Sequence, residues 1–218
     1  MRLLARLVLA GLALGGLLAA GGCGTPDDET VPPAVTTTLP PEAPQDLVDI
    51  PVGTGDVGPG DRVRGHGSVL RVNGQETHLA PLHVDELAVV QGGVFFRNGT
   101  ELWFTDLGRA RATGYSDVAS LVASPDGHRF AFLDLQHGPK DQFGTPLAIV
   151  IAYDATTGKP LLASYAGMGD IRTDDLTDLY EDGEPRIVRF EGDALLVHGA
   201  TGGDYRIPLD GSEPTKVG

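Results

Sequence analysis

The chain has 218 residues, of which 41% are hydrophobic and only 6% aromatic, with 31 glycines and 16 prolines. This composition is typical of one turn-rich globular domain and argues against a helix-rich fold. The formal net charge of −14 predicts a surface that repels nucleic acid and anionic lipid headgroups, so we expect no nucleic-acid partner and no basic patch that would hold the protein at a membrane.

The first 22 residues have the layout of a secretory signal peptide. Arg2 and Arg6 precede an uncharged apolar run over residues 7–20, which is too short for a comfortable membrane span. The run is followed by Cys23, the one cysteine of the chain. A lone exported thiol has no disulfide partner, so Cys23 needs another explanation.

The stretch "LAAGGC" that ends at Cys23 resembles the lipobox of bacterial lipoproteins, although Ala20 stands where that family usually has Leu. The resemblance implies that residues 1–22 are removed and that Cys23 becomes a diacylglyceryl-cysteine carrying palmitate-like acyl chains. We therefore expect a lipid anchor on the extracytoplasmic face of the cell membrane. The alternative is an ordinary signal peptide followed by a free cysteine.

Residues 23–46 are predicted to be the anchor and a linker. The segment after Cys23 contains six prolines and five threonines and almost no large apolar residues, so it cannot bury enough surface to fold. Proline keeps such a segment extended at about 3 Å per residue. We interpret it as a stalk that lifts the folded domain, residues 47–218, from the bilayer.

From residue 47 onward, short apolar or alternating runs are separated by glycine-containing turns, the pattern of strands and hairpins. The expected turns are at Asn73-Gly74, Gly92-Gly93, Asn98-Gly99, Gly108, Asp126-Gly127, Gly158, residues 191–193, Gly202-Gly203 and Asp210-Gly211. Three hairpins occupy the same place in successive units: "LWFTDLGRARAT", "IVIAYDATTGKPLLAS" and "YRIPLDGSEPTKV". A repeat of this length is typical of four-stranded propeller blades.

Here the sequence resembles known propellers. "SPDGHRFAFLD" is similar to the repeat of TolB-type propellers, which are themselves similar to WD-type repeats, and "AYDATTGKPLL" is more weakly similar to the repeat of quinoprotein-type propellers, with Leu162 in place of the closing Trp. The resemblance implies an all-β, β-propeller-like fold with three clear blades and a weakly patterned fourth before residue 80. A closed four-blade ring, an open partial propeller and a stack completed by a partner all remain open.

Two motifs resemble functional sites, a dinucleotide-binding loop and a catalytic triad, but are better explained as turns. "GTGDVG" at residues 53–58 matches a dinucleotide fingerprint, but Pro59 and Gly60 follow it and no helix is predicted, so we interpret it as a glycine-rich loop. Ser124, Asp126 and His128 lie too close in sequence to form a Ser-His-Asp site. Pro125 and Gly127 between them predict a tight turn that leads into a strand.

The acidic stretch over residues 169–184 aligns poorly with a calcium-binding EF-hand loop, because Arg189 stands where a bidentate Glu belongs. A short helix from Thr173 to Gly183, with its leucines and Tyr180 facing inward, is the favoured interpretation; a different cation site is the alternative. The six histidines show no metal-ligand spacing. They are His66, His78, His83, His128, His137 and His198.

The expected function is binding of a protein or ligand through propeller loops, with no catalytic residue, metal or cofactor. We expect the partner to be a protein of the cell envelope. The candidate contact residues lie in the two longest loops, 136–146 and 169–184: His137, Lys140, Asp141, Asp174, Asp175, Asp178 and Asp182. The alternatives are an extracytoplasmic hydrolase or quinoprotein-like enzyme, and a structural domain that completes a partner.

Overall fold

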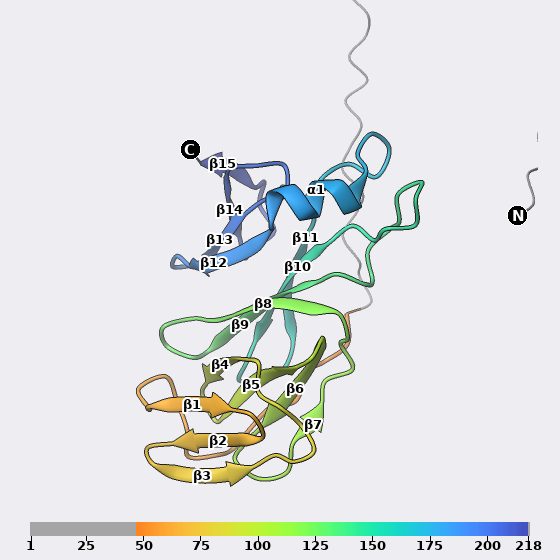
Figure 1. Cartoon of the computed structure of the whole chain (residues 1–218). Helices are drawn as coiled ribbons and strands as arrows, with labels where there is room; N and C mark the ends of the chain where they lie inside the picture. Colours follow the sequence, from red (N-terminus) through yellow and green to blue (C-terminus); the bar gives the residue numbers. More distant parts are fainter. Residues whose placement is uncertain (1–46, 218) are drawn as a thin grey trace, which may run out of the picture. The chain divides into compact units, whose positions relative to one another are not determined.

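The structure, a computed structural model, describes residues 47–217. The predictions for the signal peptide, for Cys23 and for the linker therefore lie outside the described residues. Within residues 47–217 the chain forms fifteen β-strands and one α-helix (Figure 1). None of the described helical structure is long and apolar enough to cross a membrane.

The strands form four antiparallel sheets, and in each sheet the strands that follow one another along the chain are neighbours. The first sheet has β1 (Val63–His66), β2 (Val69–Val72) and β3 (Gln75–His78). The second has β4 (Glu86–Val90), β5 (Gly93–Asn98), β6 (Glu101–Thr105) and β7 (Arg111–Ala112). The third has β8 (Val118–Ala123), β9 (Arg129–Asp134), β10 (Ile149–Asp154) and β11 (Pro160–Ser164). The fourth has β12 (Arg186–Phe190), β13 (Ala194–His198), β14 (Asp204–Pro208) and β15 (Thr215–Val217). The prediction of an all-β fold is confirmed.

The repeat seen in the sequence is a repeat of the structure. The three hairpins that align with one another are the third and fourth strands of the second, third and fourth sheets, namely β6–β7, β10–β11 and β14–β15. The sequence therefore predicted not only strands but also their position within each sheet.

The first sheet was only partly predicted. The hairpin of β2 and β3 turns at Asn73-Gly74, where both residues have positive φ, 49° and 92°, as this type of turn requires. β1 gave no clear signal, because its inward-facing side is Val63 and Gly65. Gly65 lies against Val84, and a Cβ there would be 2.3 Å from a Val84 methyl carbon. At this inward-facing position a glycine is needed so that the strand can approach Val84 closely. β1 therefore lacks the alternation of apolar and polar side chains by which a strand is usually recognised in a sequence.

A separate hydrophobic cluster lies between each pair of neighbouring sheets. One joins the first sheet to the second, through residues such as Leu70 and Phe96. Another joins the second to the third through residues such as Phe95, and a third joins the third to the fourth through residues such as Leu195. Phe95 and Phe96 thus face opposite sides of one sheet, as predicted for adjacent aromatic residues in a strand.

The first strands of the sheets lie against one another from sheet to sheet. β8 contacts both β4 and β12, and β1 contacts β4. Among the residues that the structure describes, no hydrophobic cluster joins the first sheet to the fourth. The four sheets thus form a stack in sequence order.

The helix α1 (Leu176–Gly183) lies between β11 and β12 (Figure 1). Its predicted start at Thr173 is wrong. Asp175 is the N-cap instead, since its carboxylate accepts hydrogen bonds from the N–H groups of Thr177 and Asp178, as short acidic side chains do at this position. The buried face begins with Leu176, which is fully enclosed.

Candidate functional site

The two loops that were predicted to bind a partner are in contact with each other. We call residues 136–146 the Phe143 loop and residues 169–184 the acidic segment. The hydroxyls of Thr145 and Thr177 are 2.7 Å apart. The two loops, which are separated by strands β10 and β11 in the sequence, therefore form one continuous surface beside the third and fourth sheets.

Asp141 holds the two loops together. Its carboxylate accepts hydrogen bonds from the backbone N–H groups of Phe143 and Thr145 in its own loop, both at 2.9 Å. It also accepts one from the N–H of Leu176, at 3.0 Å, across to the acidic segment. The side chain that sequence reasoning placed at the contact surface is instead buried, with 7% of the residue exposed.

The same contacts determine the charge of Asp141. Burial alone would raise the pKa of this carboxyl group, but the backbone N–H groups of Leu176, Thr145 and Phe143 outweigh burial and hold the pKa below its ordinary value. Hydrogen bonds to the charged form favour that form. Asp141 is therefore an anion at neutral pH, and its role is to fix the loops.

Tyr180 adds a second bond between α1 and the sheet that carries the Phe143 loop. Its hydroxyl oxygen accepts a hydrogen bond of 2.7 Å from the backbone N–H of Ala148. Burial raises the pKa of Tyr180 to about 12, with the bond from Ala148 acting in the opposite direction. The phenol is thus neutral at physiological pH. The helix is fixed to the Phe143 loop at Leu176 and, about one turn later, to Ala148 at Tyr180.

The Phe143 loop exposes a large apolar side chain. Phe143 is 64% exposed, although its own backbone is held by Asp141. Gly144 follows it with a φ of +93°, so the chain turns back immediately after the ring. The result is an aromatic side chain presented at the tip of a fixed turn.

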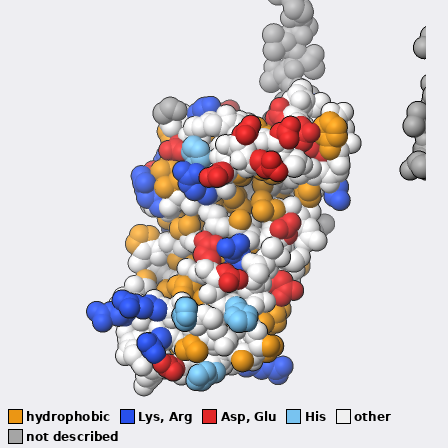
Figure 2. Space-filling view, in the orientation of Figure 1, with side chains coloured by type: hydrophobic (Ala, Val, Ile, Leu, Met, Phe, Trp, Pro, Cys, Tyr) orange, Lys and Arg blue, Asp and Glu red, His pale blue; other side chains and the backbone are white. Residues whose placement is uncertain are grey.

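The segment that contacts the Phe143 loop is acidic. The acidic segment contains Asp170, Asp174, Asp175, Asp178, Glu181, Asp182 and Glu184, against one basic residue, Arg172. Figure 2 shows acidic side chains gathered over α1. The loop pair therefore combines an exposed aromatic ring with a negatively charged neighbour.

The seven predicted contact residues have two different roles. His137, Lys140, Asp178 and Asp182 are exposed. Asp141 fixes the loops, Asp175 caps α1, and Asp174 accepts a hydrogen bond of 2.8 Å from the N–H of Asp170. The structure brings all seven to one region, but only the four exposed side chains can touch a partner without a change in the loops.

His137 belongs to a polar cluster beside the Phe143 loop. Its Nδ1 lies 2.8 Å from a carboxylate oxygen of Asp134, whose side chain is 1% exposed. Nearby, the hydroxyls of Tyr115 and Tyr153 are 2.7 Å apart, and burial raises the pKa of both. An oriented imidazole can accept a proton, but no hydroxyl of the described residues is hydrogen-bonded to this ring, so we identify no activated nucleophile here.

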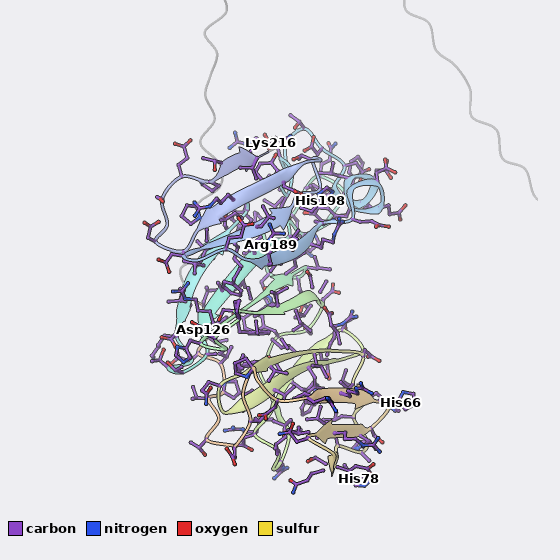
Figure 3. All side chains as sticks on the ribbon, turned by 90° about the vertical axis from the view of Figure 1, so that its left-hand side faces the viewer. His66, His78, Asp126, Arg189, His198 and Lys216 are labelled. Atoms are coloured by element: carbon purple, nitrogen blue, oxygen red, sulfur yellow. The ribbon has the colours of Figure 1, made fainter. Side chains whose placement is uncertain are left out.

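The turn at Ser124 is confirmed. The N–H of Gly127 donates to the carbonyl of Ser124 at 2.9 Å, and the Ser124 hydroxyl donates to Asp126 at 2.5 Å. The N–H of His128 donates to the same carboxylate at 3.1 Å. Asp126 thus accepts hydrogen bonds from the serine hydroxyl and from a backbone N–H, as aspartate does in a turn. In a catalytic triad the aspartate would instead bond to the histidine ring and the histidine to the serine. Figure 3 shows Asp126 at this turn.

The glycine-rich loop over residues 53–58 is confirmed as well. No helix follows it, and its glycines allow close approach to the second sheet. A Cβ on Gly53 would be 2.1 Å from the carbonyl oxygen of Gly92, and one on Gly55 would be 2.5 Å from that of Asp106. Within residues 47–217 no three His, Cys, Asp or Glu side chains are grouped to hold a metal ion.

Sequence reasoning missed Phe143, Asp134 and the two tyrosines. Phe143 did leave a signal, because it is the one large apolar residue in the polar loop "QHGPKDQFGTP". Asp134 lies on β9, Tyr153 on β10 and Tyr115 just before β8. The tyrosines contact each other only because the chain folds in three dimensions, so the sequence carried no signal for this cluster.

Comparison with known proteins adds little to this picture. No protein-family model matches the chain, and no curated protein matches it. Among solved structures, a chain in a crystal structure of a nidogen/laminin complex is similar at 12% sequence identity and a TM-score of 0.29, over 75% of this chain and 80% of that one. A similarity this weak carries no inference about function.

Proposed function

We propose that the protein is an extracytoplasmic lipoprotein, anchored through Cys23, whose domain is an open, propeller-like stack of four blades and serves as a binding module. Four consecutive antiparallel meanders support the blade assignment, and so does the contact of their first strands. The lipobox-like sequence before Cys23 supports the anchor.

The exposure of Phe143 carries the proposal of binding. Burying a phenylalanine side chain is worth about 1.5–3 kcal/mol, and here 64% of the residue is left in water at the tip of a fixed turn. Aromatic side chains held in place and surrounded by polar groups are typical binding hot spots. The turn is already ordered by Asp141, so little further conformational entropy is lost when a partner covers the ring.

The charge around Phe143 defines the partner. Five carboxylates of the acidic segment are exposed, those of Asp170, Asp178, Glu181, Asp182 and Glu184. The segment contacts the Phe143 loop, and complementary charge favours association. We infer a protein partner with an apolar recess for Phe143, bordered by lysine or arginine side chains. Lys140 and His137 are exposed on the same loop as Phe143 and contribute polar contacts at the rim.

The outer faces of the stack argue against the alternative in which a partner's sheet completes it. The outward face of the fourth sheet carries Arg186, Arg189, Arg206 and His198, and Figure 3 shows Arg189 and His198 on this sheet. A sheet packs against another sheet through apolar side chains. A further blade packed on this face would bury these basic side chains without apolar contacts.

Site-specific cross-linking in intact cells tests the proposal. A photo-reactive phenylalanine analogue replaces Phe143 in one variant and Leu161, which is 41% exposed on β11, in the control. We expect one protein adduct from position 143 and none from position 161, and we expect the Asp178→Asn, Asp182→Asn double variant to weaken the adduct. Equal adducts from both positions, or an adduct insensitive to the two neutralised carboxylates, would show that the loop pair is not the binding surface.

A further inference from the structure

The outward face of the first sheet is basic, although the protein as a whole carries a net charge of −14. Arg64 of β1 and Arg71 of β2 are directly opposite in the antiparallel ladder, so their side chains leave the same face of the sheet. Arg62 lies two residues before Arg64 and shares that face. The net negative charge of the chain therefore conceals a basic face on this sheet.

The opposite face of the same strands shows why the arginines point outward. Leu70 and Val72, on either side of Arg71, are buried in the cluster shared with the second sheet. Because alternate residues of a strand point to opposite sides, burial of these two places Arg71 in solvent. His66 and His78 flank the arginines on the outward face, and Figure 3 shows both on the first sheet.

The three arginines line a hollow. An open hollow of about 840 Å³ is lined by Gly60, Asp61, Arg62, Arg64, Arg71, Asn73 and Gly74. A second hollow of about 330 Å³ adjoins it and shares Arg64 and Arg71. The two cations that face each other across the ladder therefore stand between two recesses.

The positive charge of the hollow is only partly neutralised. Arg71 forms an ion pair with Glu76 of β3, and among residues 47–217 neither Arg62 nor Arg64 has a carboxylate within ion-pair distance. Asp61 also lines the hollow, but its carboxylate accepts hydrogen bonds from the Asn73 amide at 2.6 Å and from the N–H of Gly58 at 2.8 Å. The hollow thus has two guanidinium groups without an ion pair, those of Arg62 and Arg64, and one carboxylate, Asp61, that is bonded to Asn73 and Gly58.

Two like charges directly opposite in a ladder destabilise the sheet. Arg64 and Arg71 are both exposed, and neither contributes to a hydrophobic cluster of the fold. A bound anion would relieve their repulsion. This arrangement is a cost to the free protein that a ligand removes.

We propose that this hollow binds a short oligophosphate, that is, a small molecule with two or three adjoining phosphate groups. Guanidinium groups bind phosphate oxygens through two parallel N–H donors. Cross-strand neighbours are about 5 Å apart and residues two apart in a strand about 7 Å apart, so three arginines can contact adjoining phosphates of one ligand. A long polyanion fits less well, because the basic face is limited to three arginines on one small sheet and the chain as a whole carries a net charge of −14.

This site is independent of the proposed loop surface, which lies on other sheets. Purified full-length protein is titrated with tripolyphosphate, with citrate and inorganic phosphate as comparison anions, by calorimetry and by thermal unfolding. We expect tripolyphosphate to bind most tightly, to raise Tm as a ligand of the native state does, and to bind more weakly as salt is added.

The variants Arg64→Gln and Arg71→Gln test the residues. Loss of charge-assisted hydrogen bonds predicts about tenfold weaker binding, or more, for each. The matched control is Arg206→Gln, an exposed arginine of β14, which should bind as the wild type does. Arg64→Gln should also keep or raise Tm in the absence of ligand, because it removes the opposed charge, and this result shows that the variant is folded.

Several outcomes would overturn the proposal. The first is that tripolyphosphate does not bind, or that citrate binds as tightly as tripolyphosphate does. The second is that the Arg64→Gln variant still binds tripolyphosphate with unchanged affinity, or that the Arg206→Gln control loses as much affinity as the Arg64→Gln variant. Preferential binding to vesicles that contain anionic phospholipid, with no competition from tripolyphosphate, would overturn it as well and would assign the face to a membrane surface.

Discussion

The carboxylate of Asp141 accepts a hydrogen bond from the backbone N–H of Leu176, 3.0 Å away and thirty-five residues further along the chain. This N–H belongs to the first residue of α1, which has no partner within the helix. One side chain therefore both orders the turn that presents Phe143 and completes the start of the helix that carries the acidic surface.

We expect the Asp141→Asn variant to release both loops together. An amide has one acceptor oxygen where the carboxylate has two, so some of the backbone N–H groups now bonded to Asp141 must lose their partner. Hydrogen exchange should accelerate in residues 136–146 and 169–184 and remain slow in β9 and β10. Asp178→Asn, on the exposed face of the same helix, is the control. Faster exchange in one loop alone would contradict the coupling.

The same carboxylate predicts a pH dependence. The pKa of Asp141 is below its ordinary value in the folded protein, while in the unfolded chain it is about 3.9. A depressed pKa contributes stability above the unfolded pKa, and this contribution is lost as the pH falls through the folded pKa.

The difference in Tm between the wild type and Asp141→Asn should therefore be constant at neutral pH and should narrow below about pH 4. Other aspartates with lowered pKa, such as Asp126 and Asp154, act in both proteins and so do not affect this difference. Thermal unfolding from pH 7 to pH 2 measures it. A gap that widens on acidification would show that the carboxylate is not the form that the fold stabilises.

Tyr153 fixes the start of the described chain to the third sheet. Its hydroxyl donates to the carbonyl of Val48 at 2.7 Å, so Tyr115 is the donor in the bond between the two phenols. We expect Tyr153→Phe to destabilise the protein by about 1–3 kcal/mol, because the buried Tyr115 hydroxyl and the Val48 carbonyl both lose their partner. Tyr115→Phe leaves the Val48 bond in place and should cost less. Urea unfolding of the two isosteric variants measures the difference, and an equal cost would contradict this assignment of donors.

The sequence was a good guide wherever local geometry determines structure. Turns depend on a few adjacent residues, so Asn73-Gly74 and the Ser124 turn could be recognised directly. The repeated hairpins could be aligned because each has a glycine at its turn, Gly108, Gly158 and Gly211. At the first of these turns the residue with positive φ is Leu107 and not Gly108. From these, the all-β fold and the order of strands within each sheet follow.

What could not be predicted depends on contacts between distant residues. The bond from Leu176 to Asp141, the pairing of Arg64 with Arg71 and the Tyr115–Tyr153 contact are set by register and by the packing of neighbouring sheets. The net charge was also a misleading guide to the charge of individual faces. A net charge of −14 describes the average surface and conceals three arginines that β-strand alternation places on one face.

At the end of α1 the sequence predicted the right residue, Gly183, for the wrong physical reason. Gly183 was expected to end the helix, and the helix does end there, but the residue in the left-handed conformation is Glu184, with a φ of 42° and its N–H bonded to the carbonyl of Tyr180. Gly183 is required for another reason, since a Cβ there would be 2.2 Å from the carbonyl oxygen of Ala200.

The two positions should therefore respond in opposite directions. Glycine relieves the left-handed strain, which is roughly 1 kcal/mol for other residues, so Glu184→Gly should stabilise the protein slightly. Gly183→Ala should destabilise it by about 1–3 kcal/mol, because the methyl group overlaps fixed backbone and not a mobile side chain. Urea unfolding of both variants measures the two free energies. Stabilisation by Gly183→Ala would mean that the helix does not pack on Ala200 as described.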